Sequence, residues 1–157
     1  MQCSIARTLD VVGEWWTLLI IRDLMNGNRR FSGLLDSLGI SKKILTDRLE
    51  TLLAEGIVKQ VPTEAASKRL EYRLTQKGLE LSPILLSLMA WGDKWAFKNK
   101  PPVLVTHIAC GEVTSPGGLC DHCDEPLDHT NISVAPSKHM TKTAQARWQT
   151  YFDKKTG

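Results

Sequence analysis

Residues 41–56 read SKKILTDRLETLLAEG, and this stretch decides the fold that the sequence predicts. Leu45, Leu49 and Leu52 recur at i, i+4 and i+7, with Ile44 and Leu53 beside them, which is the spacing of a helix buried along one side. The other side is polar, and the first turns of such a helix can reach base edges and phosphates in a DNA major groove. We interpret the stretch as a recognition helix; the alternative is an ordinary amphipathic surface helix. Its candidate DNA-binding residues are Ser41, which also suits the N-cap, and Lys42, Lys43, Thr46 and Arg48.

The flanking segments favour the DNA-binding interpretation. Residues 31–38 carry apolar side chains on one side and predict a short helix, which only Gly39 and Ile40 separate from Ser41. Two helices joined by a tight, glycine-containing turn form a helix-turn-helix, whose second helix is presented to DNA. After Gly56 the apolar period changes from 3.6 to 2, so residues 57–61 and 69–74 predict the strands of a β-hairpin, or wing.

Basic residues accompany these elements. Lys68 and Arg69 lie near the tip of the predicted wing, and Arg29 and Arg30 precede the short helix. We expect them to contact phosphates or the minor groove, with a solvated hairpin tip as the alternative for the first two. The chain's net charge is +3, and residues 28–73, with nine basic and six acidic residues, account for all of it. This concentration is typical of a nucleic-acid footprint.

Further helices complete the predicted first domain. Apolar spacing predicts helices over residues 5–13 and 15–25, and one long helix over residues 75–98 with Pro83 in its first turns. The long helix has two apolar faces, whereas a small domain covers one, so we expect a symmetric homodimer. The alternative is that the first helix and the tail cover both faces. One face carries Ile84, Leu88, Trp91 and Trp95, and the other carries Leu81, Leu85 and Met89.

The tail contains a pattern of metal ligands. His107 and Cys110 form one pair three positions apart, and Cys120 and Cys123 form a second pair. Two such knuckles are how a tetrahedral zinc site is usually assembled, so we predict one structural zinc per chain and no other required cofactor. The alternative is a β-hairpin with free cysteines. His122 and His129 are spare ligand candidates.

The rest of the tail predicts a strand, a linker and a last helix. Residues 103–108 alternate like a strand, residues 130–137 are polar and predict a linker, and Ser137 is a candidate cap for a last helix. The apolar stripe expected on that helix contains Met140, Ala144, Trp148 and Tyr151 or Phe152. The predicted fold class is therefore mainly α with a small β-hairpin: a winged helix-turn-helix domain over residues 1–100, followed by a cysteine-containing extension over residues 101–157.

Several motifs in residues 3–98 match one family. They are Cys3, Ala6-Arg7, Leu9-Asp10-Val11-Val12-Gly13, Trp16, Arg30-Phe31-Ser32, Ile40-Ser41, Leu45-Thr46-Asp47-Arg48-Leu49, Tyr72, Leu74-Thr75, Gly78 and Ala90-Trp91-Gly92. In these motifs the chain resembles the HxlR-type transcriptional regulators, bacterial winged helix-turn-helix proteins that are similar to MarR-type regulators. Ser4, Trp15 and Gly33 depart from the proline, lysine and glutamate common in the family, but they do not touch the predicted DNA-reading residues. The resemblance implies a dimeric repressor that binds double-stranded DNA at a pseudo-palindromic operator.

The same resemblance makes Cys3 a candidate redox switch. Some members of the family use a cysteine at the start of the first helix to sense oxidants or electrophiles, which would be the effector here. A helix N-terminus and the nearby Arg7 would favour the reactive thiolate. The alternative is that Cys3 is a small buried residue that fills space.

Other classes of protein fit the sequence poorly. No apolar run approaches the roughly 20 residues that span a bilayer, and residues 1–12 lack a signal-peptide cleavage region, so we expect no membrane association and a cytoplasmic location. A glycine-rich phosphate loop, a G-x-S-x-G elbow and a plausible carboxylate pair are missing from the sequence, so we do not expect an enzyme. The rival function is a winged helix that docks proteins and carries a metal-stabilised tail.

Overall fold

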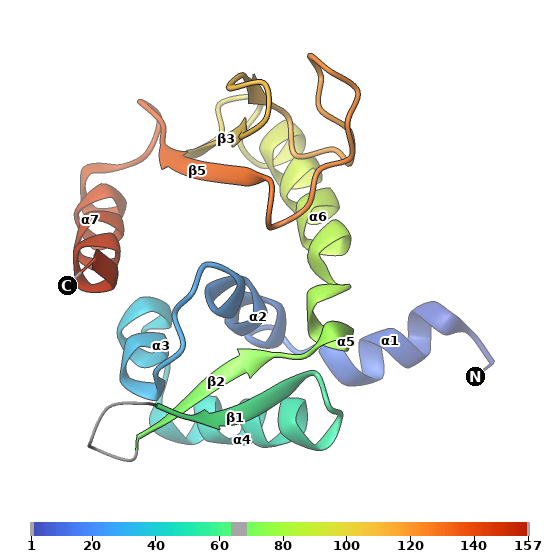
Figure 1. Ribbon diagram of the computed structural model, residues 1–157, viewed down its shortest axis with the longest axis vertical. Coiled ribbons are helices and arrows are strands. Elements are labelled where there is room, and N and C mark those ends of the chain that lie inside the picture. Colours follow the sequence, from blue (N-terminus) through green and yellow to red (C-terminus); the bar gives the residue numbers. More distant parts are fainter. Residues whose placement is uncertain (1, 64–68, 157) are drawn as a thin grey trace. The chain divides into compact units, whose positions relative to one another are not determined.

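The computed structural model describes residues 2–63 and 69–156, with side chains described up to residue 149 (Figure 1). The chain forms two compact units, Met1–Glu80 and Leu81–Gly157, and each is described by itself. The division at residue 100 that the sequence suggests assigns the long helix to the DNA-binding part and stays a prediction.

The first unit is a winged helix-turn-helix, as the sequence predicts. Four helices precede a two-stranded antiparallel hairpin, and a one-turn helix follows it. The elements are α1 (Ser4–Val12), α2 (Thr17–Met25), α3 (Phe31–Leu38), α4 (Lys42–Ala54), β1 (Val58–Pro62), β2 (Leu70–Leu74) and α5 (Gln76–Leu79).

The helix-turn-helix follows from local signals in the chain. Helix α3 ends at Gly39, whose φ of 66° is left-handed and whose N–H donates to the carbonyl of Leu35 at 2.8 Å. Ser41 then caps α4, because its hydroxyl accepts a hydrogen bond from the N–H of Ile44 at 3.2 Å. The three leucines of the stripe in α4 are buried. Ile44 is 39% exposed, so the prediction that it widens the buried stripe is wrong.

The wing contacts the segment before α3 and the chain that follows β2. Strands β1 and β2 pair from Val58 opposite Leu74 to Pro62 opposite Leu70, and the N–H of Tyr72 donates to the carbonyl of Arg29 at 2.9 Å. In α5, a Cβ on Gly78 would lie 2.4 Å from the carbonyl oxygen of Ile57. Only glycine allows the chain after the wing to approach this closely.

The second unit contains two helices and a small sheet. Its elements are α6 (Ser82–Trp95), β3 (Val103–His107), β4 (Val113–Thr114), β5 (Ile132–Pro136) and α7 (Lys142–Thr156). The sheet is antiparallel in the order β4-β3-β5. Leu86 of α6 packs with Cys120, Leu127 and Ile132, and the N–H of His129 donates to the Ser82 hydroxyl at 3.1 Å. The packing fixes the segment after β4 on this helix.

Three expectations for the second half of the chain are wrong. The predicted helix over residues 75–98 is interrupted between α5 and α6, and Pro83 lies in the first turn of the new helix, where its missing N–H is harmless. The predicted linker over residues 130–137 contains strand β5. Ser137 does not cap α7, because its hydroxyl donates to the carbonyl of Pro101; Thr141 accepts from the N–H of Ala144 instead.

Candidate functional site

The first turns of α4 present polar side chains to solvent. Lys42, Lys43 and Thr46 are exposed, as predicted for residues that read a groove. Lys43 lies 3.6 Å from the carboxylate of Asp47, one turn on, whereas Lys42 has no ion-pair partner within residues 2–63 and 69–149. An exposed pair of this kind is worth little in water, so both ammonium groups are available to a phosphate.

Arg48 lies apart from these residues. Its side chain is 27% exposed, and its Nη1 atom is 3.7 Å from Oε1 of Glu14, in the connection between α1 and α2. This ion pair joins the recognition helix to the front of the unit. Sequence spacing gives no signal for the pair, because 34 positions separate the two residues.

The other predicted DNA contacts flank α3 and the wing. Arg29 and Arg30 are exposed just before α3, and Arg69 is exposed where β2 begins. The carbonyl of Arg69 accepts a hydrogen bond from the N–H of Thr63 at 2.8 Å, which closes this end of the hairpin. Lys68 lies outside the described residues.

Cys3 occupies the N-cap position of α1 and is half-buried. Its carbonyl accepts from the N–H of Arg7 at 3.0 Å, and its side chain makes no capping hydrogen bond. The Arg7 guanidinium is 3.8 Å from the carboxylate of Asp10. Both side chains are mostly exposed, so this pair is worth little in water and leaves the positive charge of Arg7 one turn from Cys3.

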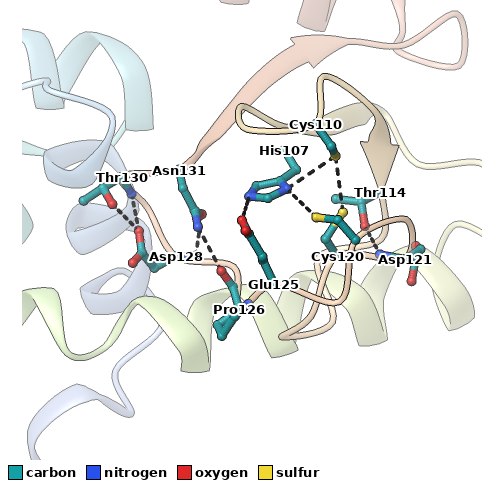
Figure 2. Close-up of polar contacts among 11 residues, drawn as sticks. His107, Cys110, Thr114, Cys120, Asp121, Glu125, Pro126, Asp128, Thr130 and Asn131 are labelled. Atoms are coloured by element: carbon teal, nitrogen blue, oxygen red, sulfur yellow. Dashed lines mark hydrogen bonds and ion pairs between the residues drawn. The ribbon is translucent and has the colours of Figure 1, made fainter.

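In the second unit, the four predicted metal ligands converge (Figure 2). Nδ1 of His107 lies 3.4 Å from Sγ of Cys110 and 3.2 Å from Sγ of Cys123, and the sulfurs of Cys110 and Cys120 are 3.7 Å apart. All four ligand atoms lie within 4.8 Å of one another. The sequence correctly predicts which residues come together, and the spare candidates, His122 and His129, are not in the cluster.

These separations fit a zinc ion. Tetrahedral zinc with ordinary bond lengths places two sulfur ligands about 3.8 Å apart and a sulfur and a nitrogen about 3.6 Å apart. The observed sulfur–sulfur distance of 3.7 Å and nitrogen–sulfur distances of 3.2 and 3.4 Å are close to these values. Three thiols and one imidazole are also the soft and borderline donors that zinc prefers.

The two ligand pairs sit on loops with the same backbone hydrogen bonds. In the first loop, the N–H of His107 donates to the carbonyl of Glu112, and the N–H of Gly111 donates back to the carbonyl of His107. In the second loop, Cys120 takes the place of His107, Glu125 that of Glu112, and Asp124 that of Gly111. Gly111 and Asp124 have φ values of 75° and 57°, so both loops turn through a left-handed residue directly after the second ligand.

The thiols compete for negative charge. Burial raises the pKa of the Cys120 thiol, but hydrogen bonds from the backbone of His122 and Cys123 and from neighbouring thiols lower it to about 6. A backbone hydrogen bond from Glu125 lowers the pKa of Cys123, but burial and the other two sulfurs raise it to about 11. A bound cation would remove the competition, because it deprotonates every coordinating thiol.

Two carboxylates that the sequence analysis did not single out support the cluster. Oδ2 of Asp121 accepts from the N–H and the hydroxyl of Ser115, both at 2.7 Å, and these hydrogen bonds hold the pKa of Asp121 below its usual range. Oε2 of Glu125 lies 3.5 Å from Nε2 of His107, on the side of the ring away from the sulfurs. The sequence signal that could have identified them is their position: Asp121 directly follows Cys120, and Glu125 lies two residues after Cys123.

Comparisons with known proteins agree with this architecture. A family model described as HxlR-like helix-turn-helix matches residues 11–100. An HTH-type transcriptional regulator of Mycobacterium tuberculosis, Rv3095, is 40% identical over 134 residues, which cover 85% of each chain. The crystal structure of PA1607, a putative transcription factor, matches with a TM-score of 0.60 and 34% identity, covering 82% of this chain and 81% of that one.

The match to a further solved structure covers only part of this chain. Quinone-bound YodB from Bacillus subtilis matches with a TM-score of 0.52 and 30% identity; the match covers all of that chain but only 60% of this one. The alignment with Rv3095 is long enough that it must reach beyond residue 100. The tail is therefore shared in part with some relatives and lacks a full counterpart in YodB. Among the described helices, none is long and apolar enough to cross a membrane.

Proposed function

The chain belongs to the HxlR-like helix-turn-helix family of transcriptional regulators, and we propose that it acts as a homodimeric repressor on a pseudo-palindromic DNA operator. The observation that carries the proposal is the first half of α4. A capped helix, held by three buried leucines, exposes Lys42, Lys43 and Thr46 side by side. This is the arrangement that places side chains in a major groove.

The flanking basic residues supply the phosphate contacts. Arg29 and Arg30 lie at the start of α3, and Arg69 lies on the wing, so exposed cations surround the helix-turn-helix within one unit. Phosphate contacts fix the register of a protein on DNA, and base contacts specify the sequence. Arg48 is also expected to face the major groove, and its ion pair with Glu14 would have to give way to a DNA contact of the guanidinium.

Dimerisation is supported by uncovered apolar surface. On α6, side chains spaced like one helical face are between 43% and 65% exposed: Ile84, Leu88, Trp91 and Trp95. On α1, Ile5 and Leu9 are 71% and 56% exposed. An uncovered apolar helix face of this kind marks an interface, and a second copy of the chain is the commonest partner. Trp91→Glu should convert the dimer to a monomer in sedimentation, whereas a Trp91→Glu variant that stays dimeric would contradict this interface.

The DNA-reading assignment is tested by affinity and its salt dependence. Lys42→Ala/Lys43→Ala should bind an operator duplex at least 10-fold more weakly and should flatten the dependence of log affinity on log salt by up to about four units, because each subunit of the dimer loses up to two phosphate contacts. Lys138→Ala removes an exposed charge from the tail and serves as the control. Equal affinity of the double variant and the wild type would show that α4 does not read DNA.

We also propose that the cluster holds one structural zinc per chain. The matched backbone of the two loops supports this, because each loop presents its ligands in the same way. Four protein ligands leave no open position for a substrate, so the metal would stabilise the tail. Elemental analysis of protein purified without chelators should find about one zinc per chain. Finding no zinc would contradict this proposal and leave His107 and the three cysteines as a cluster without a metal.

The effector we propose is an oxidant or electrophile that acts at Cys3. This rests on the half-buried thiol at the N-terminus of α1 and on the similarity to YodB, whose structure holds a quinone. Treatment with diamide or a quinone should lower operator affinity in the wild type and leave Cys3→Ser unchanged. A response that persists in Cys3→Ser would move the sensor to the tail cysteines.

A further inference from the structure

The two nitrogens of the His107 ring face different groups. Nδ1 faces the sulfurs of Cys110 and Cys123, whereas Nε2 faces the carboxylate of Glu125 at 3.5 Å (Figure 2). The ring is fully buried, and Nε2 makes no hydrogen bond within the described part of the chain. One edge of the imidazole is thus aimed at the cluster, and the other is buried beside a single carboxylate.

A zinc-bound imidazole has strict proton requirements. A nitrogen that binds the metal must be unprotonated, so the neutral ring carries its proton on the other nitrogen. A buried N–H without an acceptor costs free energy, and metal-bound histidines almost always donate this N–H to an outer group. If His107 binds through Nδ1, its Nε2–H needs an acceptor, and the Glu125 carboxylate lies 3.5 Å away on that side of the ring.

We propose that Glu125 is a positioning residue of the metal site, which accepts the Nε2–H of His107 and so holds the ring with Nδ1 toward the thiols. The inference rests on the zinc proposal above. The present separation exceeds a full hydrogen bond by a few tenths of an ångström. The Glu125 side chain is 59% exposed, so a small rotation about its own bonds closes this gap without moving the core.

The backbone around Glu125 explains why its carboxylate can do this. The carbonyl of Glu125 accepts from the N–H of Cys120 at 2.8 Å, so the second loop holds the residue in place. Its side chain then reaches the histidine of the first loop, which links the two ligand pairs. The equivalent residue of the first loop is Glu112, whose carbonyl accepts from the N–H of His107 at 3.0 Å and whose side chain is not part of the cluster.

This equivalence provides a matched control. Glu112 and Glu125 occupy the same position of the two loops and carry the same charge, so Glu112→Ala and Glu125→Ala change the tail equally except at the His107 ring. Zinc affinity of the full chain is measured by competition with a chromophoric chelator. Glu125→Ala should weaken zinc binding by about 10–100-fold, and Glu112→Ala should leave it within about threefold. Glu125→Gln, whose amide oxygen still accepts the N–H, should restore most of the affinity.

A second measurement reports the tautomer directly. Long-range ¹H–¹⁵N correlation spectra of the zinc-loaded wild type should show the His107 proton on Nε2 and the metal on Nδ1. A proton on Nδ1, or equal zinc affinities of Glu125→Ala and Glu112→Ala, would overturn the role of Glu125 while leaving the zinc site intact. A wild type that binds no zinc would overturn both proposals.

Discussion

Among the described side chains, the first unit buries ten apolar ones, whereas the second unit, of nearly equal length, buries four. Three of those four, Leu86, Cys120 and Leu127, pack together, and Cys120 is itself part of the ligand cluster. The first unit can therefore be stabilised by its core alone. The second has too little apolar burial for its size, and a bound metal would supply the difference. On the zinc proposal, one chain would combine two sources of stability.

The sharpest test of this difference removes the metal. Cys120→Ser, or a strong chelator on the wild type, should abolish amide-exchange protection in β3 and β5, because zinc binding contributes on the order of 10 kcal/mol to such sites. Protection in α2 and α4 should persist. Hydrogen exchange of the full chain checks both units in one experiment.

Cys3→Ser is the matched control, because it removes a thiol from the first unit and leaves the cluster whole. Protection of β3 and β5 that survives the loss of Cys120 would show that the tail does not depend on metal.

A substitution at Gly78 should destabilise the first unit and leave the second unit unchanged. Gly78→Ala places a Cβ 2.4 Å from the carbonyl oxygen of Ile57, well inside van der Waals contact, so the turn after the wing must shift. We expect the first unit to lose about 1–3 kcal/mol of stability, read from the exchange of buried amides in α2 and α4. The tail sheet should be unaffected.

Gly92→Ala in α6 is the control, since a Cβ there meets no atom within 4 Å. This change should be neutral or stabilise by up to about 1 kcal/mol. Equal effects of the two substitutions would mean that the close approach at Gly78 does not constrain the fold.

The smallest expected effect concerns the recognition helix. Ser41→Ala removes the hydroxyl that accepts from the N–H of Ile44 and should cost about 1 kcal/mol, while Ser41→Gly should cost only a few tenths. Exchange of the first amides of α4 measures the change. If Ser41→Ala leaves these amides as protected as in the wild type, the cap contributes nothing to the helix.

Features that local chemistry determines could be predicted from the sequence. The bounds of α3 and α4 follow from the Gly39 turn, the Ser41 cap and the leucine spacing, all within a few residues of the ends they set. The ligand cluster could be predicted because the two ligands of each pair lie only three positions apart in the sequence. Strand β5 was not predicted although Ile132 and Val134 alternate with Ser133, since the Asn, Pro and Ser residues around them are typical of a loop.

Contacts between distant residues could not be predicted. Nothing near Arg48 indicates its ion pair with Glu14, and nothing near Glu125 indicates that the His107 ring turns its Nε2 toward it. The interruption before α6 could not be predicted from Pro83. Proline suits the first turn of a new helix, as here, but it is also tolerated in the early turns of a longer helix.

The proposal that this family member reads DNA as a dimer through α4 has a direct test. The duplexes that the purified full chain selects from a random pool are sequenced. We expect an enriched inverted repeat, with half-site centres about 10 base pairs or a multiple of that apart. Selection with Lys42→Ala/Lys43→Ala should lose the enrichment. A pool that stays random with the wild type, or that yields the same repeat with the double variant, would contradict the proposal.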